Sequence, residues 1–210
     1  MPIRLTIQAE VIDICNDVPR QDDIFLVDTN VWLWQTYNSS IPSDPRVRAK
    51  ISTYTSYLKK ARVAGATLAY SGLILAELAH VIEKTEREIY NKRTGNSLNA
   101  KEYRHNNLAE RANVVAEVES AWKQVEGLAV TVDLTVNEKI TNASLARFKT
   151  QALDGYDLLI LEAIGLAGAG QIKVITDDMD YAVVPGIQVF TNNGLVIQQA
   201  TAQGKLIITR

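Results

Sequence analysis

Four acidic residues of this 210-residue chain stand where a carboxylate has chemical consequences. Asp28 and Asp178 each follow a short apolar, β-prone run. Glu77 lies within an apolar helical pattern, and Asp157 precedes an apolar stretch. Each of them alone has an ordinary explanation as a turn residue or a helix cap. Several carboxylates that converge at one place repel one another unless cations neutralise them, so together they predict a metal site.

The available ligands favour Mg²⁺ or Mn²⁺ as the metal. The chain has a single cysteine, Cys15, and two histidines, His80 and His105. Carboxylate oxygens are hard ligands that suit these two ions better than they suit zinc or copper. Such ions commonly position phosphate groups and activate water for in-line displacement. A phosphodiester is therefore the expected substrate.

The setting of each acid also has a structural interpretation that stays open. Glu77 lies four residues after Leu73 and four before Val81, on an apolar stripe where a charge is costly unless it is paired or bound to a cation. Asp157 and Asp154 are placed to cap the helix that follows them. The sequence leaves undecided whether Asp154, or the acids at 177 and 180, also contribute to the site.

The segments around these acids alternate between strands and helices. Such alternation predicts a parallel sheet with helices on both faces, in which ligands bind beyond the carboxyl ends of the strands. Asp28 and the acidic run 177–180 fall at two such ends. The expected strands are 24–27, 67–70, 128–132, 172–176 and 187–190, the expected helices are 45–64, 73–89, 100–126, 137–148 and 158–169, and 91–99 is expected to be a loop.

Composition restricts the class of protein. Hydrophobic residues make up 47% of the chain and charged residues 22%, which is typical of one globular domain. No apolar run is long enough to span a bilayer, and the first residues lack the apolar core of a signal peptide. We therefore expect a cytoplasmic protein without a membrane partner. The net charge of -2 gives no overall positive field, although carboxylates that hold metal ions lower this count.

Four segments resemble the signature segments of PIN-domain nucleases, in the order that this family has them. They are residues 25–31 (FLVDTNV), 75–78 (LAEL), 157–163 (DLLILEA) and 174–181 (VITDDMDY). The resemblance covers roughly residues 24–193, and the most similar subgroup is the VapC-like toxin ribonucleases. It implies a three-layer α/β/α PIN-like fold with a mainly parallel central sheet, a Mg²⁺ or Mn²⁺ site, and endonucleolytic cleavage of RNA.

The resemblance also assigns roles to individual residues. The positions that match the four family acids, as catalytic residues and metal ligands, are Asp28, Glu77, Asp157 and Asp178. Asn30 and Thr176 match small polar positions that usually hold the carboxylates in place. Because water rather than the RNA 2′-hydroxyl attacks, the products are expected to carry a 5′-phosphate and a 3′-hydroxyl.

The chain is longer than a compact VapC-like toxin. Glu77 and Asp157 are 80 positions apart, which predicts a helical insertion around 91–126. We accordingly expect an N-terminal extension at 1–23, a PIN-like nuclease domain at 24–193 and a C-terminal tail at 194–210.

The resemblance implies an RNA substrate, an antitoxin partner if the protein is a toxin, and a homodimer. Two alternatives remain: a catalytically weak PIN-like binding or regulatory subunit that docks through the helix at 100–126, and a metal-dependent phosphatase for small phosphate esters. Cations that could bind RNA lie in one helix and around the insertion, at Arg46, Arg48, Lys50, Lys59, Lys60, Arg62, Lys92, Arg93, Lys101 and Arg104.

Overall fold

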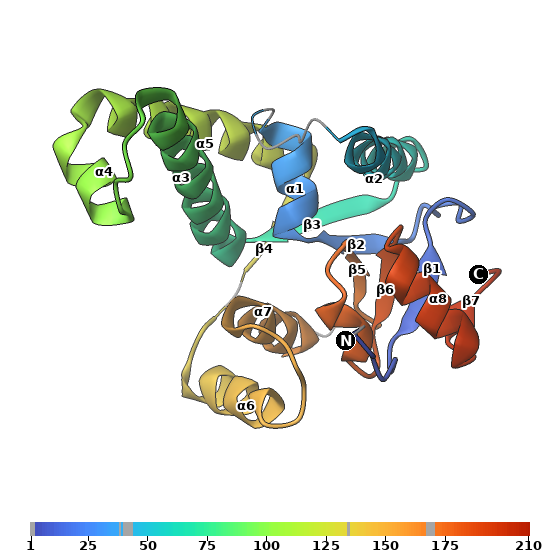
Figure 1. Ribbon diagram of the computed structural model, residues 1–210. Coiled ribbons are helices and arrows are strands. Elements are labelled where there is room, and N and C mark those ends of the chain that lie inside the picture. The colour runs from blue at the N-terminus through green and yellow to red at the C-terminus, as the bar shows by residue number, and fades with distance from the viewer. Residues whose placement is uncertain (1–2, 38, 40–43, 134, 167–170) are drawn as a thin grey trace.

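A computed structural model describes residues 3–37, 39, 44–133, 135–166 and 171–210 of the chain. Its strands form one seven-stranded sheet in the order β4-β3-β2-β5-β6-β1-β7, and every neighbouring pair is parallel (Figure 1). Helices connect most of the strands, because a parallel pair needs a long crossover. The expected α/β class with a parallel sheet is confirmed.

The element bounds agree with the expected pattern in most places. The strands are β1 (Glu10–Asp13), β2 (Ile24–Val27), β3 (Thr67–Ser71), β4 (Val130–Val132), β5 (Lys173–Ile175), β6 (Gln188–Thr191) and β7 (Leu206–Ile207). The helices are α1 (Thr29–Thr36), α2 (Pro45–Val63), α3 (Gly72–Thr94), α4 (Ala100–Asn106), α5 (Leu108–Leu128), α6 (Glu138–Phe148), α7 (Gly155–Leu166) and α8 (Gly194–Ala202), with a 3₁₀ turn η2 at Asp180–Val183. The end of the helix expected at 158–169 lies outside the described residues.

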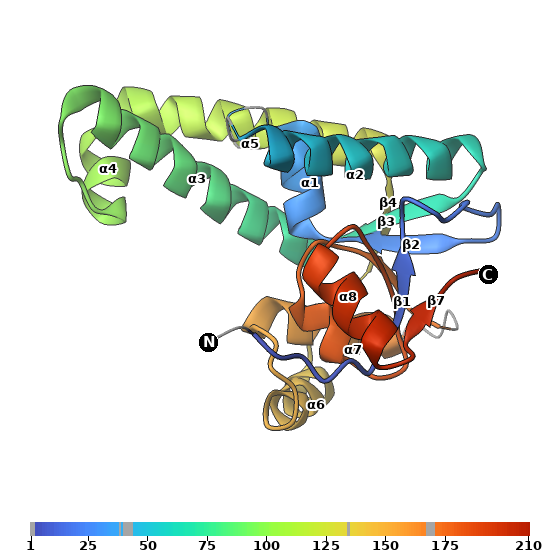
Figure 2. The same cartoon turned by 45° about the vertical axis from the view of Figure 1, so that its right-hand side comes forward.

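The sheet lies between two layers of helices. Figures 1 and 2 show α1, α2 and α5 over one face and α7 and α8 over the other, with α6 packed on α7. Strand residues such as Phe25, Val174 and Phe190 are fully buried between these layers. The edge-to-face contact of Phe25 with Phe190, at 4.8 Å between ring centroids, joins β2 to β6 across β5.

The strand order reverses direction between β2 and β5. From β2 the chain adds β3 and then β4 on one side, whereas from β5 it adds β6 on the other. The two connections therefore leave the carboxyl ends of β2 and β5 toward opposite sides, and such a switch point is where ligands bind in open parallel sheets. Asp28 directly follows β2, and Thr176 directly follows β5.

Both segments expected to flank the domain supply strands to the same sheet. Residues 1–23 contain β1, which pairs with β6 and β7. Residues 194–210 contain α8, which packs on β1, and the edge strand β7. The limits 24–193 of the nuclease-like region stay a prediction, but the folded sheet extends beyond them.

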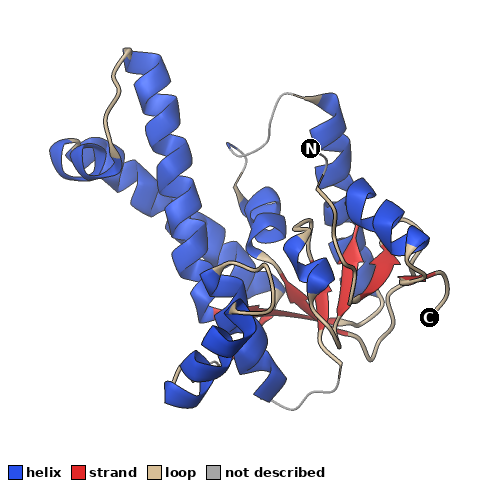
Figure 3. Ribbon diagram, turned by 60° about the horizontal axis from the view of Figure 1, so that its bottom comes forward, coloured by secondary structure: helices blue, strands red, loops and turns tan. Residues whose placement is uncertain are grey.

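The expected insertion forms a helical extension made of α3, α4 and α5, which projects beyond the sheet (Figures 2 and 3). The structure corrects two expectations here. Helix α3 continues through the expected loop to Thr94 and ends at Gly95, whose φ of 72° suits a residue without a Cβ. The single helix expected at 100–126 is two helices, because the backbone of Asn107 leaves the helical region (φ -129°, ψ 75°).

No helix among the described residues is long and apolar enough to cross a bilayer.

Candidate active site at the carboxyl edge of the sheet

Asp28 lies at the centre of the site, where β2 ends and α1 begins. It is the N-cap of α1, and its Oδ1 accepts a hydrogen bond of 2.7 Å from the backbone N–H of Thr29. Its Oδ2 accepts a 2.7 Å hydrogen bond from the hydroxyl of Thr176 at the end of β5. Only 7% of Asp28 is exposed. Two neighbouring strand ends therefore fix the orientation of this carboxylate.

Glu77 reaches the site from the second turn of α3. The hydroxyl of Thr29 donates a hydrogen bond to its Oε2, so one residue contacts both Asp28 and Glu77. Thr29 is a site residue that the sequence did not single out. The neighbouring Asn30, which was expected to hold a carboxylate, is exposed. Thr29 could have been recognised as a polar residue that follows a capping aspartate.

Asp157 approaches from the opposite helical layer. It lies in the first turn of α7, is 5% exposed, and accepts a hydrogen bond from the hydroxyl of Tyr181 in η2. Asp154 has a capping role, since its Oδ1 accepts hydrogen bonds from the backbone N–H groups of Tyr156 and Asp157. Through this cap Asp154 also lies close enough to raise the pKa of Asp157 and Glu77 by its charge.

The turn after β5 separates two adjacent aspartates. Asp178 donates its backbone N–H to the Thr176 hydroxyl at 2.8 Å, and its charge raises the pKa of Asp28 and Glu77. Asp177 turns toward α2, where it accepts hydrogen bonds from Lys50 at 2.9 Å and Tyr54 at 3.0 Å. Asp178 therefore adds its negative charge to that of the other acids, and Asp177 anchors the turn to α2.

The acids of the site act on one another through their charges. Burial raises the pKa of Asp28 to about 7, and the charges of Glu77 and Asp178 contribute to the rise. Burial likewise raises the pKa of Asp157 to about 8, and the negative charge of Asp28 adds to it. The pKa values of Glu77 and Asp180 are also raised, mainly by burial. The carboxylates thus share a region that disfavours their simultaneous ionisation.

The donor set suits a hard divalent cation. It consists of carboxylates from four separate elements, and the hydrogen bonds described above leave oxygen lone pairs free on Asp28, Glu77 and Asp157. Across the described part of the chain, no three His, Cys, Asp or Glu side chains already lie at positions that could hold one ion together. The assignment of Asp28, Glu77, Asp157 and Asp178 as metal ligands stays a prediction.

Ser71 is a further polar group at this edge. It precedes α3, but its side chain makes no capping hydrogen bond, and its fully buried hydroxyl has no partner among the described atoms. Strands β2 and β3 pair Leu26 with Ala69, so continuing this register by two residues sets Ser71 beside Asp28.

Several cations that were expected to bind RNA have acidic partners within the protein. Lys50 pairs with Asp177, Arg93 with Glu110, and Arg104 with Glu83. Trp32 is fully buried, whereas the half-buried Trp34 packs against Tyr54 with 5.5 Å between ring centroids. Neither tryptophan is presented as an exposed stacking surface.

No family model matches the sequence, and no curated protein matches it. Among solved structures, the chain is similar to a chain in VapBC2 from Rickettsia felis bound to a DNA fragment from their promoter. The two chains are 17% identical, and the match covers 80% of this chain and 98% of that one with a TM-score of 0.45.

Proposed function

We propose that this protein is a PIN-like, Mg²⁺- or Mn²⁺-dependent endoribonuclease. The observation that carries the proposal is the arrangement of acids from four segments of the chain around the carboxyl ends of β2 and β5. Asp28, Thr29 and Glu77 form one chain of contacts, and Thr176 extends it to Asp178. The same acids occupy the positions at which the sequence resembles the four PIN-domain signature segments.

The residues of the site have separable tasks in this proposal. A divalent cation held by the carboxylates would neutralise their repulsion, orient the scissile phosphate and promote ionisation of the attacking water. Thr176 and the start of α1 hold Asp28 in one orientation, and Thr29 holds Glu77 beside it. Tyr181 holds Asp157 from the far side. Attack by water leaves a 5′-phosphate and a 3′-hydroxyl on the products.

A toxin with an antitoxin partner is the finer assignment that we propose within this class. It rests on the resemblance of the four segments to VapC-like toxin ribonucleases. Expression of the wild-type chain would then arrest bacterial growth, whereas expression of Asp28→Asn would not. A stand-alone RNA-processing enzyme would permit growth in both cases while retaining cleavage in vitro.

The decisive test is cleavage of a mixed panel of single-stranded RNAs by purified wild-type protein and by Asp28→Asn, with Mn²⁺, Mg²⁺ or EDTA. We expect the wild-type protein to cleave RNA with either metal, EDTA to abolish cleavage, and Asp28→Asn to be at least 100-fold slower, on the order of what one electrostatic catalytic group contributes. Asp22→Asn is the matched control because Asp22 is exposed and precedes the same strand.

A generic phosphate ester in the same assay separates the remaining alternatives. Metal-dependent hydrolysis of the ester without RNA cleavage would establish the phosphatase instead. RNA binding without cleavage of any substrate would establish the regulatory subunit. Equal cleavage by wild-type protein and Asp28→Asn would show that the activity comes from another site or a contaminant.

A further inference from the structure

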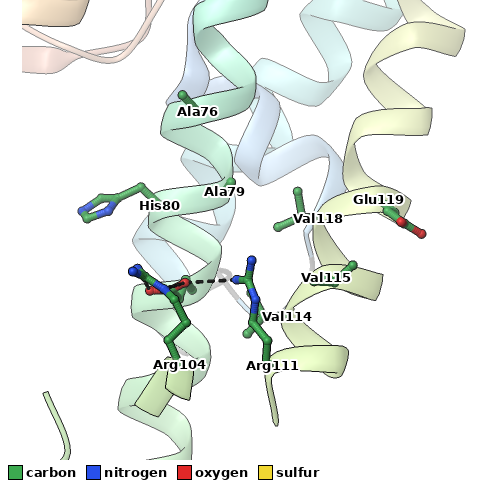
Figure 4. A pocket seen from close by; sticks show the side chains of 10 residues that line it. Ala76, Ala79, His80, Arg104, Arg111, Val114, Val115, Val118 and Glu119 are labelled. Carbon is green, nitrogen blue, oxygen red and sulfur yellow. Dashed lines mark hydrogen bonds and ion pairs between the residues drawn. The ribbon is translucent and has the colours of Figure 1, made fainter. Parts of the chain in front are cut away.

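A cavity of about 460 Å³ lies between α3 and α5 in the helical extension. Its walls include Ala76 and Ala79 from α3 and Val115 and Val118 from α5. The side chains of Arg104 and Arg111 lie at one end of it, as Figure 4 shows. The cavity thus combines short apolar walls with two guanidinium groups, and the site described above uses none of these residues.

One glutamate holds both arginines in place. Glu83 accepts hydrogen bonds from Nε and Nη2 of Arg104 and, at 3.2 Å, from Nη1 of Arg111. These contacts leave Nη1 of Arg104 and both Nε and Nη2 of Arg111 for a ligand. The side chains of Arg104 and Arg111 are 41% and 44% exposed, so a ligand can reach them.

The charges at this end of the cavity leave one positive charge uncompensated, because two arginines share Glu83. Glu119 also borders the cavity, but Figure 4 shows its carboxylate turned away from both guanidinium groups. A phosphodiester carries a single negative charge, and its oxygens match the planar N–H donors of a guanidinium group. The alanine and valine walls suit the uncharged part of a nucleotide.

The cavity and the candidate active site share helix α3. Ala76 directly precedes Glu77, and Glu83 follows Glu77 by six positions on the same helix. Six residues of α-helix span about 9 Å. A nucleic-acid strand, which places a charge roughly every 3.4 Å along its axis in helical form, covers this distance in about two to three nucleotides.

We propose that this cavity is a subsite for one nucleotide of the RNA strand, with its phosphodiester on Arg111 and Arg104 and its sugar and base against the apolar walls. The proposal rests on the proposed nuclease function. It adds a place where a nucleotide next to the cleaved bond would bind. Arg111 is the principal anion ligand, because Glu83 engages only one of its nitrogens. Glu83 is a positioning residue that holds the two guanidinium groups at one end of the cavity.

The test measures binding of a fluorescent ten-nucleotide single-stranded RNA by anisotropy, in EDTA so that no strand is cut, at several salt concentrations. We expect Arg111→Gln to weaken binding about tenfold and to lower the slope of log K against log salt by about 0.7, as for the loss of one phosphate contact. Lys123→Gln is the matched control, because Lys123 is an exposed cation of α5 that does not line the cavity. Circular dichroism and thermal melting verify that each variant is folded.

Turnover with Mn²⁺ provides a second readout. Arg111→Gln is expected to raise KM about tenfold with kcat changed less than twofold, since the subsite binds substrate and transition state alike. If the wild-type protein binds and cleaves RNA but Arg111→Gln has the same RNA affinity, the subsite proposal is wrong and the nuclease function stands. The cavity would then be a candidate site for a protein partner. A folded wild-type protein that neither binds nor cleaves RNA would overturn the nuclease function and the subsite together.

Discussion

The two ends of strand β2 each carry a buried aspartate, in opposite electrostatic settings. Asp23 precedes the strand and is 1% exposed, and Asp28 follows it and is 7% exposed. Hydrogen bonds from Arg210 and Lys173 outweigh the effect of burial at Asp23 and lower its pKa to about 2. Burial and neighbouring acids raise the pKa of Asp28 to about 7.

This difference shows that burial alone does not decide what a carboxylate does in a fold. At Asp23 the countercharges come from the protein itself, and Arg210 also bonds Asp17 and lies over the ring of Phe190 at 4.5 Å. A carboxylate with such partners stabilises the native state. The charges that act on Asp28 are those of other acids, and the hydrogen bonds from Thr176 and Thr29 do not outweigh burial and this repulsion. A cation from outside would supply the missing countercharge.

The largest expected loss of stability is at Asp23, the aspartate whose charge is compensated by Arg210 and Lys173. Arg210→Ala leaves the buried carboxylates of Asp17 and Asp23 without their shared partner, which should lower the free energy of unfolding by about 4 kcal/mol. Urea denaturation monitored by circular dichroism measures this change. Arg93→Ala, which breaks an exposed pair, should cost under about 1 kcal/mol. Equal losses in the two variants would contradict the comparison.

A second prediction concerns whether the charge of Asp28 stabilises or destabilises the folded protein. The folded-state pKa values of Asp28 and Asp157 lie above their ordinary value near 3.8, so the native state holds more protons than the unfolded chain. Without metal, their contribution to stability should therefore fall as the pH rises from about 4 to about 8. Asp28→Asn should raise the free energy of unfolding by about 1 to 2 kcal/mol at pH 8, because it removes one repelling charge.

Urea denaturation at pH 5 and pH 8 tests this prediction, and Mg²⁺ sharpens it. Saturating Mg²⁺ should raise the melting temperature of the wild-type protein and have a smaller effect on Asp28→Asn. The opposite pH behaviour is expected from Asp23, whose lowered pKa makes its contribution fully present above about pH 4 and lost as the pH falls toward 2. If Asp28→Asn destabilised the fold at pH 8, the interpretation that the negative charge of Asp28 lacks a countercharge in the protein would be wrong.

The smallest expected effect is at Asp177, and it separates this residue from its neighbour. The carboxylate of Asp177 accepts hydrogen bonds from Lys50 and Tyr54. We therefore expect Asp177→Asn to retain RNA cleavage within about threefold of the wild-type rate. Asp178→Asn should reduce cleavage by at least about 100-fold, because Asp178 is the proposed fourth acid and its charge acts on Asp28 and Glu77. Initial rates with Mn²⁺ measure both variants. A larger loss in Asp177→Asn than in Asp178→Asn would reverse the assignment of the fourth acid.

Most of the elements around the site could be predicted because their signals are local. The apolar run 24–27 predicted the strand that ends just before Asp28, and the apolar spacing around Glu77 predicted the helix that carries it. The break at Asn107 was not predicted; the structure shows it as the residue that ends α4 and begins α5. The strand β1 was missed because 10–13 is short, and its pairing with β6 joins residues far apart in the chain.

What the sequence by itself determined is the order of the four acids along the chain and the parallel α/β class that gathers strand ends at one edge, whereas the role of these acids as metal ligands stays a prediction. Residue type and periodicity suffice for these, since both are properties of short segments. Only the tertiary structure decided which groups surround each acid: Thr29 rather than Asn30 beside Glu77, Asp177 turned toward Lys50, and Arg210 beside Asp23. Those choices depend on contacts between distant segments, which also determine whether a buried carboxylate is compensated.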